Sequence, residues 1–230
     1  PQGLVLGNEP NRDRLATLRQ NMLRLNFPQV ATCCHPGEAL PLPDSGWDYI
    51  QLDPPCSGWG VAEKHPKVTT LWTGDKVAPL VALQKQLLKE AARLLAPGGR
   101  LVFSTCTTNV AENEAQALWA VRELGLEPEP IPPFPGFHFA PSEIPETADY
   151  GCLRVDGDLS EAQGFFVARF RKPGVSSPVP DTPEAHEPPG VHLDVTEFDT
   201  AQHSPAIAWE ALPPGRVAAF KERVIFLPQA

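Results

Sequence analysis

Short apolar runs alternate with amphipathic segments of helix length along the first 124 residues, and this alternation restricts the fold more than any other feature. Apolar side chains recur at intervals of three and four residues over about 12–25 and 77–95, which predicts a helix in each segment. Runs that predict strands lie beside these helices, at residues 4–6, 30–34, 49–52 and 100–103. Strands that alternate with helices of ten or more residues are typical of βαβ units. The sequence therefore predicts an α/β fold with a mostly parallel sheet.

Local signals predict where two of the helices end or begin. Pro97-Gly98-Gly99 follows the second helix and predicts its end, because glycine is common just beyond a helix and proline cannot continue one. Asn109 is a good N-cap for a third helix, expected to run to about Leu124. Glu112 lies three residues after Asn109, which is the acidic position of a capping box.

The C-terminal half of the chain has a different organisation. Strand signals return at 152–155 and 164–170, and they fit an antiparallel edge added to the sheet. Residues 173–190 hold six prolines and no periodicity, which predicts a linker. The last forty residues are too few to bury much core alone, so 191–230 is expected to be an appendage or a partial domain. The sequence therefore predicts one domain over residues 1–172, followed by the linker and the appendage.

Charge and cysteine usage narrow the class of protein. The net charge is −9, but residues 1–110 carry 11 Lys and Arg against 9 Asp and Glu, so an RNA partner is not excluded. The five cysteines form no CxxC pair and no regular framework, so neither a disulfide scaffold nor a metal site is expected in this protein. This cysteine usage fits a protein of the reducing cytoplasm. The apolar stretches have strand length and no secretory leader is recognisable, so no membrane partner is expected.

Two cysteines directly follow predicted strands and are the strongest functional signal. Cys56 lies in Asp53-Pro-Pro-Cys-Ser-Gly58, and Cys106 lies in Ser104-Thr-Cys-Thr107. Ligands of open α/β sheets bind at the carboxyl ends of parallel strands, and a thiolate there can add to an electron-poor ring. Each motif alone also fits a structural role, as a buried thiol or a stiff proline turn. The combination favours covalent thiol chemistry.

These motifs resemble the Sun-type (NOL/NOP/Sun) RNA cytosine-C5 methyltransferases. The resemblance runs over about residues 3–172 and also includes Asn113-Glu114 and the segment 164–169. It is greatest with the bacterial small-subunit ribosomal RNA branch. It implies a Rossmann-like, S-adenosylmethionine-dependent methyltransferase domain over 1–172. The first strand and the Gly-rich cofactor loop of that fold would precede Pro1, so a truncated start is expected.

The resemblance also implies a role for four residues. Cys106 would add to carbon 6 of cytosine, which makes carbon 5 nucleophilic enough to accept a methyl group, and Cys56 would assist release. Asp53 would lie at the junction of S-adenosylmethionine and the base. Glu9, just beyond a predicted strand, would hold the cofactor ribose, although a solvated loop carboxylate fits its position equally well. The RNA partner would be ribosomal rather than transfer RNA.

Two other functions fit parts of the pattern. Asp-Pro-Pro followed by an aromatic residue is typical of amino-group methyltransferases, although Cys56 occupies the aromatic position here. Such an enzyme would not need the Cys106 thiol. The second alternative is a catalytically inactive RNA-binding or assembly fragment that keeps the fold and binds no S-adenosylmethionine.

Overall fold

The computed structural model describes two compact units of the chain. It describes residues 3–25, 27, 29–62, 64–72 and 74–175, and the backbone of three strands within 191–228. The smaller unit combines residues 1–36 with 181–230, and the larger unit comprises residues 37–180. None of the helices in these ranges has the length and apolar character needed to cross a bilayer.

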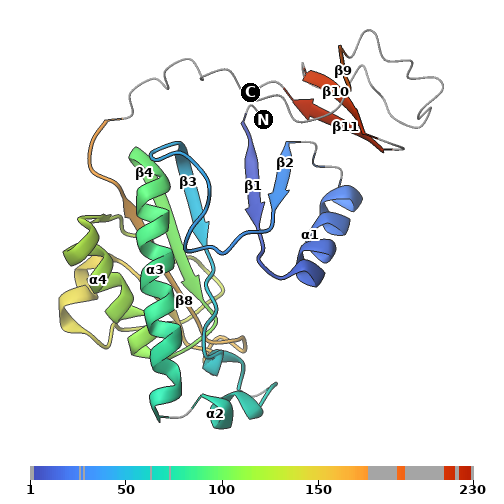
Figure 1. Cartoon of the computed structure of the whole chain (residues 1–230). Coiled ribbons are helices and arrows are strands. Elements are labelled where there is room, and N and C mark those ends of the chain that lie inside the picture. Colours follow the sequence, from blue (N-terminus) through green and yellow to red (C-terminus); the bar gives the residue numbers. More distant parts are fainter. Residues whose placement is uncertain are drawn as a thin grey trace. The chain divides into compact units, whose positions relative to one another are not determined.

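The smaller unit begins with a strand–helix–strand segment (Figure 1). Strands β1 (Val5–Asn8) and β2 (Val30–Cys33) pair in parallel, and helix α1 (Arg12–Leu25) connects them. The side chain of Asn11 accepts hydrogen bonds from the backbone N–H groups of Asp13 and Arg14, so it caps the first turn of α1. The sequence predicted α1 at its observed ends, β2 to within one residue and β1 to within two residues.

The described C-terminal strands form a separate antiparallel sheet. The strand order is β11 (Arg223–Pro228), β10 (Gly215–Phe220) and β9 (Val191–Asp194). The predicted linker over 173–190 lies outside the described residues from position 176 onward. The predicted division into a domain, a linker and an appendage remains a prediction.

The larger unit is a mixed sheet with two long helices on one face (Figure 1). Strand β3 (Trp47–Leu52) pairs in parallel with β4 (Leu95–Thr105), and helix α3 (Ala78–Leu94) connects them. The predicted antiparallel addition is present, with β8 pairing β4 and β7 pairing β8. Its remaining elements are η1 (Trp59–Val61), α2 (Lys67–Leu71), η2 (Gly74–Val77), η3 (Val110–Glu112), α4 (Glu114–Leu124), β5 (Glu127–Pro128), β6 (Phe139–Ala140), η4 (Pro145–Tyr150), β7 (Leu153–Val155) and β8 (Phe165–Arg171).

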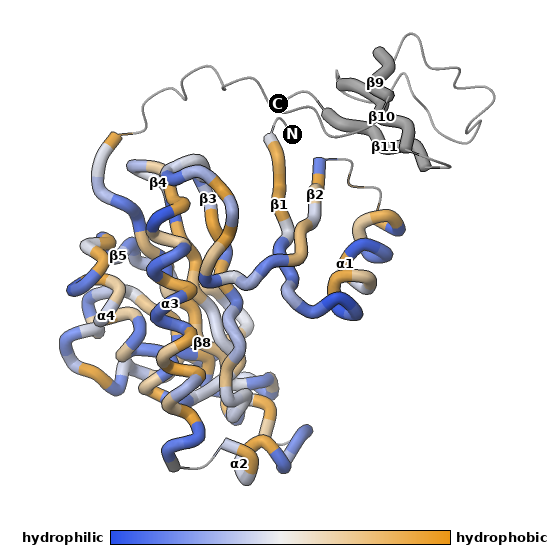
Figure 2. Tube along the Cα trace, in the orientation of Figure 1, coloured by the Kyte–Doolittle hydropathy of each residue, from blue (hydrophilic) through white to orange (hydrophobic). Residues whose placement is uncertain are grey.

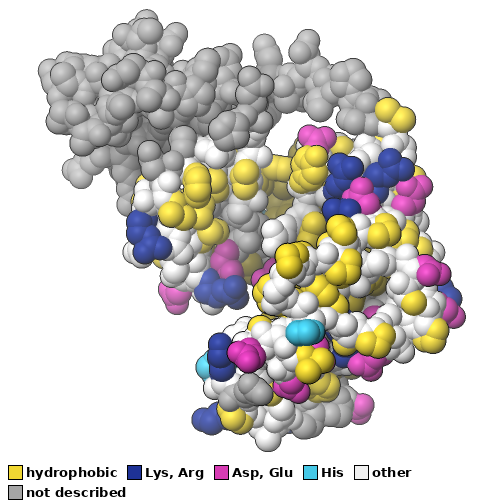
Figure 3. Space-filling model, turned by 180° about the vertical axis from the view of Figure 1, so that it is seen from behind, with side chains coloured by type: hydrophobic (Ala, Val, Ile, Leu, Met, Phe, Trp, Pro, Cys, Tyr) yellow, Lys and Arg dark blue, Asp and Glu magenta, His cyan; other side chains and the backbone are white. Residues whose placement is uncertain are grey.

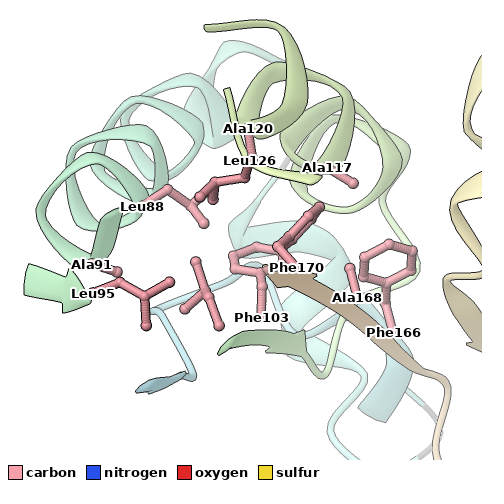
Figure 4. Packing of buried hydrophobic residues seen from close by; sticks show 11 residues of the cluster. Leu88, Ala91, Leu95, Phe103, Ala117, Ala120, Leu126, Phe166, Ala168 and Phe170 are labelled. Carbon is pink, nitrogen blue, oxygen red and sulfur yellow. The ribbon is translucent and has the colours of Figure 1, made fainter. Parts of the chain in front are cut away.

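The core of the larger unit lies between this sheet and helices α3 and α4 (Figure 4). Phe103 on β4 and Phe166 on β8 are fully or almost fully buried, and their rings meet edge to face with centroids 6.5 Å apart. Hydrophobic residues concentrate along β4 and β8, whereas α3 alternates between hydrophobic and hydrophilic residues (Figure 2). This alternation is expected of a helix that buries one face. The core cluster consists of Leu88, Ala91, Leu95, Leu101, Phe103, Ala117, Ala120, Leu126, Phe166, Ala168 and Phe170.

Helix α3 ends before the Pro-Gly-Gly segment that was expected to stop it. The helix ends at Leu94, and the backbone of Leu95 is already extended and paired with Trp47 of β3. The Pro-Gly-Gly segment instead forms an irregularity within β4, where Gly98 has a φ of 79°. A side chain at Gly99 would meet the carbonyl oxygen of Ala96 at 2.8 Å. The glycines therefore allow a bulge, not a helix cap.

The opposite face of this sheet carries hydrophobic side chains that α3 and α4 do not cover (Figure 3). Successive side chains of a strand point to opposite faces, so Phe165 and Val167 lie on this second face while Phe166 and Ala168 enter the core. An open apolar cavity of about 550 Å³ lies there. Its lining residues are Lys64, Ile131, Phe134, Phe137, Phe139, Leu153, Val155, Ala162, Gln163, Phe165 and Val167.

Candidate active site

The two cysteines singled out by the sequence meet at one edge of the sheet. Cys106 directly follows the carboxyl end of β4, and Cys56 follows the neighbouring parallel strand β3 by four residues. Their sulfur atoms are 3.2 Å apart and form a hydrogen bond. Both thiols are only partly buried, so the pair is accessible from outside the protein. We call Cys56 and Cys106 the thiol pair.

The hydrogen bond gives the two thiols different acidities. Donation from the Cys56 thiol lowers the pKa of Cys106 to about 7, against the opposing effects of burial and of the charges of Asp53 and Glu112. The same hydrogen bond raises the pKa of Cys56 well above its ordinary value, and burial raises it further. At neutral pH, Cys106 is therefore a thiolate in about half of the molecules, and Cys56 remains the neutral donor beside it.

Glycine is required where the backbone closes over the Cys106 loop. The N–H of Gly60 donates to the Cys106 carbonyl oxygen at 3.1 Å, and the Gly164 N–H donates to the Gly60 carbonyl oxygen at 3.1 Å. A side chain at Gly60 would collide with the carbonyl oxygens of both Gly164 and Cys106. Gly60 and Thr108 also line an open cavity of about 380 Å³, together with Trp59 and Lys64. This cavity therefore lies next to the Cys106 loop, and its charged lining residues are Lys64, Arg154, Asp156 and Asp158.

A buried carboxylate lies beneath the thiol pair, at a residue to which the sequence assigned a different role. Glu112 is fully buried, and its two oxygens accept four hydrogen bonds. The donors are the Ser57 N–H at 3.0 Å, the Ser57 hydroxyl at 2.5 Å, Gln84 Nε2 at 3.0 Å and Asn109 Nδ2 at 3.0 Å. The backbone N–H of Asn109 donates instead to Thr107 Oγ1, so the capping-box prediction for Glu112 is wrong. The Asn109 side chain accepts from the Ala111 N–H and so caps the short helix η3, whereas α4, the helix that ends at Leu124, begins only at Glu114, after Asn113.

Further polar side chains complete this buried network. The Thr105 hydroxyl donates to Asn113 Oδ1 at 2.5 Å, and Asn113 Nδ2 donates to the Thr107 carbonyl oxygen at 2.9 Å. Gln84 is fully buried on α3 and donates to the Pro55 carbonyl oxygen at 2.9 Å. Sequence reasoning missed Gln84, although a signal was present. Gln84 lies four residues from both Leu80 and Leu88, on the apolar face of the predicted helix.

The two predicted cofactor residues lie in different units. Asp53 follows β3 in the larger unit, is exposed, and lies near enough to Cys106 for its charge to raise the pKa of that thiol. Glu9 follows β1 in the smaller unit, where its carboxylate accepts from the Asn11 N–H at 2.9 Å and pairs with Arg14 at 3.1 Å. The Glu9 side chain is 15% exposed, and its role toward a cofactor stays a prediction.

The fold and the comparisons define the class of protein. The mixed α/β sheet corresponds to the Rossmann-like fold of the S-adenosylmethionine-dependent methyltransferases. Residues 1–171 match the family described as 16S rRNA methyltransferase RsmB/F. The chain belongs to this family, which confirms the resemblance to the Sun-type enzymes and to their bacterial small-subunit ribosomal RNA branch.

Similar proteins agree with this assignment. The ribosomal RNA small subunit methyltransferase F of Enterobacter sp. (strain 638) is 36% identical over 181 residues, covering 78% of this chain and 37% of the relative. The enzyme of that name from Citrobacter koseri is 37% identical over 182 residues, with the same coverage. The chain thus spans little more than a third of the length of these relatives.

Solved structures show the same similarity. The crystal structure of NSun6 from Pyrococcus horikoshii with SFG has a TM-score of 0.63 and 27% identity, covering 74% of this chain and 41% of that one. A methyltransferase homolog protein from Pyrococcus horikoshii has a TM-score of 0.60 and 29% identity, covering 74% of this chain and 53% of that one.

Proposed function

We propose that this protein transfers a methyl group from S-adenosylmethionine to carbon 5 of cytosine in 16S ribosomal RNA, through a covalent bond between Cys106 and the base. The observation that carries the proposal is the contact between the two sulfur atoms, 3.2 Å apart at the carboxyl ends of β3 and β4. One sulfur is activated as a thiolate, and the other is held as a neutral donor. A buried structural cysteine would need neither feature.

The residues of the thiol pair divide the chemistry between them. The Cys106 thiolate adds to carbon 6 of the ring, and the displaced π electrons make carbon 5 nucleophilic. When bound, S-adenosylmethionine supplies an electrophilic methyl group, whose bond to sulfur breaks as its bond to carbon 5 forms. A water molecule then takes the proton from carbon 5, the electron pair of that C–H bond restores the 5,6 double bond, and the carbon 6–sulfur bond breaks to release the Cys106 thiolate. A hydrogen bond from the Cys56 thiol stabilises that thiolate as it departs.

The described residues fit the cofactor in two respects. Asp53 places an exposed carboxylate near the thiol pair, where negative charge favours the cationic sulfonium group. Glu9 places an acceptor just beyond the carboxyl end of β1, which suits ribose hydroxyl groups. Each of its oxygens already accepts one hydrogen bond or ion pair, and a carboxylate has further lone pairs. Both roles are part of the proposal.

The target must be accessible to both thiols. A base inside an RNA helix has to be flipped out, at a cost of a few kcal/mol. Trp59 and Lys64 line the adjoining cavity, and they offer stacking and phosphate contacts to single-stranded RNA. The cytoplasm as the place of action, and the absence of metal and membrane partners, remain predictions from the sequence.

A methyl-transfer assay on unmodified 16S ribosomal RNA tests this function. The full-length protein, the RNA transcript and S-adenosylmethionine with a labelled methyl group are incubated, and the digested nucleosides are analysed by mass spectrometry. We expect the label in 5-methylcytidine. Label on an exocyclic amino group would instead support the amino-group alternative. No label and no heat of S-adenosylmethionine binding would support an inactive RNA-binding fragment.

A further inference from the structure

Ser57 and Thr107, the residues that immediately follow the two cysteines, are joined through buried hydrogen bonds. The Ser57 and Thr107 hydroxyl groups lie 2.7 Å apart, and both side chains are about 1% exposed. Neither residue belongs to a helix or strand that would hold it in place. The separation of the two sulfur atoms therefore depends on contacts between two loops, which are the backbone bond from the Gly60 N–H to the Cys106 carbonyl oxygen and these side-chain hydrogen bonds.

Glu112 is the centre of these contacts. Its carboxylate takes two hydrogen bonds from Ser57 and one from Gln84, which in turn binds the Pro55 carbonyl oxygen. Glu112 is therefore linked to the Cys56 loop on both sides of the cysteine, directly to Ser57 and through Gln84 to Pro55. Its fourth bond, from Asn109, fixes the chain just after the Cys106 loop. Burying a carboxylate is costly unless it is well hydrogen-bonded, so a fully buried one with four donors is a strong link.

We propose that Glu112 is a positioning residue that holds the Cys56 loop against the Cys106 loop and so keeps the two sulfur atoms in contact. Its importance for catalysis rests on the proposed function, but its effect on the thiol pair does not. Each carboxylate oxygen accepts two donors, so both oxygens are needed. A glutamine has nearly the same size but turns an N–H₂ group toward two of these donors. Glu112→Gln should therefore separate the loops.

The pH profile of Cys106 alkylation distinguishes positioning from a purely electrostatic effect. In the unchanged protein, the hydrogen bond from Cys56 lowers the pKa of Cys106 to about 7, while the charges of Asp53 and Glu112 raise it. Loss of the Glu112 charge alone would therefore move the midpoint of the alkylation profile to a lower pH. Separation of the loops removes the Cys56 donor, which returns Cys106 toward the ordinary thiol pKa of about 8.5. The two roles thus predict shifts of opposite sign.

The experiment measures iodoacetamide labelling of Cys106 by peptide mass spectrometry between pH 5.5 and 9.5, without RNA or cofactor. We expect Glu112→Gln to raise the midpoint of the labelling profile by roughly one pH unit. Ser57→Ala removes the hydroxyl bonds but keeps the backbone donor, so it should shift the midpoint in the same direction by less. If Glu112→Gln does not fold, as judged by circular dichroism, Ser57→Ala alone decides.

Thr147→Val is the matched control, because it removes another buried hydroxyl of the same unit. Thr147 is 1% exposed, and its hydroxyl contacts Ser142 and the Ile144 carbonyl oxygen. The midpoint of Cys106 labelling in the Thr147→Val variant should equal that of the unchanged protein. An unchanged or lowered midpoint in the folded Glu112 and Ser57 variants would overturn the positioning role. Because no RNA is present, this outcome is independent of whether the protein forms 5-methylcytidine.

Discussion

Replacing Cys106 by alanine is expected to reduce methyl transfer by at least about a thousandfold, because loss of a covalent nucleophile removes most of a reaction's acceleration. Carbon 5 of cytosine would then have to attack the methyl group without prior addition at carbon 6. The variant should keep its fold, because Cys106 is only partly buried and lies beyond the end of β4. The measurement is the initial rate of 5-methylcytidine formation in 16S ribosomal RNA.

Cys152→Ala is the matched control for this variant. Cys152 packs against the hydrophobic core of the same unit, and burial raises its pKa to about 12, so it is a neutral thiol. Its removal should change the rate by no more than about twofold, since a free cysteine in a core behaves as a small apolar residue. A Cys106 variant that retained a tenth of the original rate of 5-methylcytidine formation would contradict nucleophilic catalysis by Cys106.

Replacing Cys56 by alanine is expected to leave the protein joined to its RNA. The Cys56 thiol donates to the Cys106 sulfur, which stabilises the thiolate that departs when the carbon 6–sulfur bond breaks. A hydrogen bond to a charged group contributes about 1.5–3 kcal/mol, so its loss should slow release by roughly ten- to a hundredfold. After incubation with S-adenosylmethionine, a protein–RNA species that survives denaturation should accumulate on a gel.

The same variant should also alter the pH dependence of addition. Without the donor, the pKa of Cys106 rises from about 7 toward that of an ordinary thiol. The thiolate is then a minor form at pH 7, and the adduct should form faster at pH 8.5. The Cys56, Cys106 double alanine variant should give no adduct at either pH. Full turnover by Cys56→Ala without an adduct would show that the second thiol takes no part in release.

The parts of the fold that depend on local pattern were predictable from the sequence. The apolar spacing of residues 12–25 and 77–95 predicted α1 and α3, because apolar residues recur every three or four positions in a helix that buries one face. The Pro-Gly-Gly segment was misread, because its conformation is set by pairing of β4 with β3. Local propensity gives way there to a tertiary contact.

The contact between the two cysteines was predictable for a related reason. Parallel neighbouring strands deliver the residues at their carboxyl ends to the same edge, so the contact between Cys56 and Cys106 follows from topology. The role of Glu112 does not. Its partners Ser57 and Gln84 lie 55 and 28 residues away in the sequence, whereas a capping box is defined by a spacing of three. Periodicity cannot show such a link.

The identity of the residue that bonds to the base tests the central claim most directly. In RNA that carries 5-fluorocytidine, fluorine cannot leave carbon 5 as a proton does, so the adduct formed by the unchanged protein should persist. After nuclease digestion, tandem mass spectrometry identifies the modified peptide. The thiol-pair mechanism predicts the nucleotide on Cys106. Attachment to Cys56, or no attachment by protein that methylates ordinary cytidine, would contradict it.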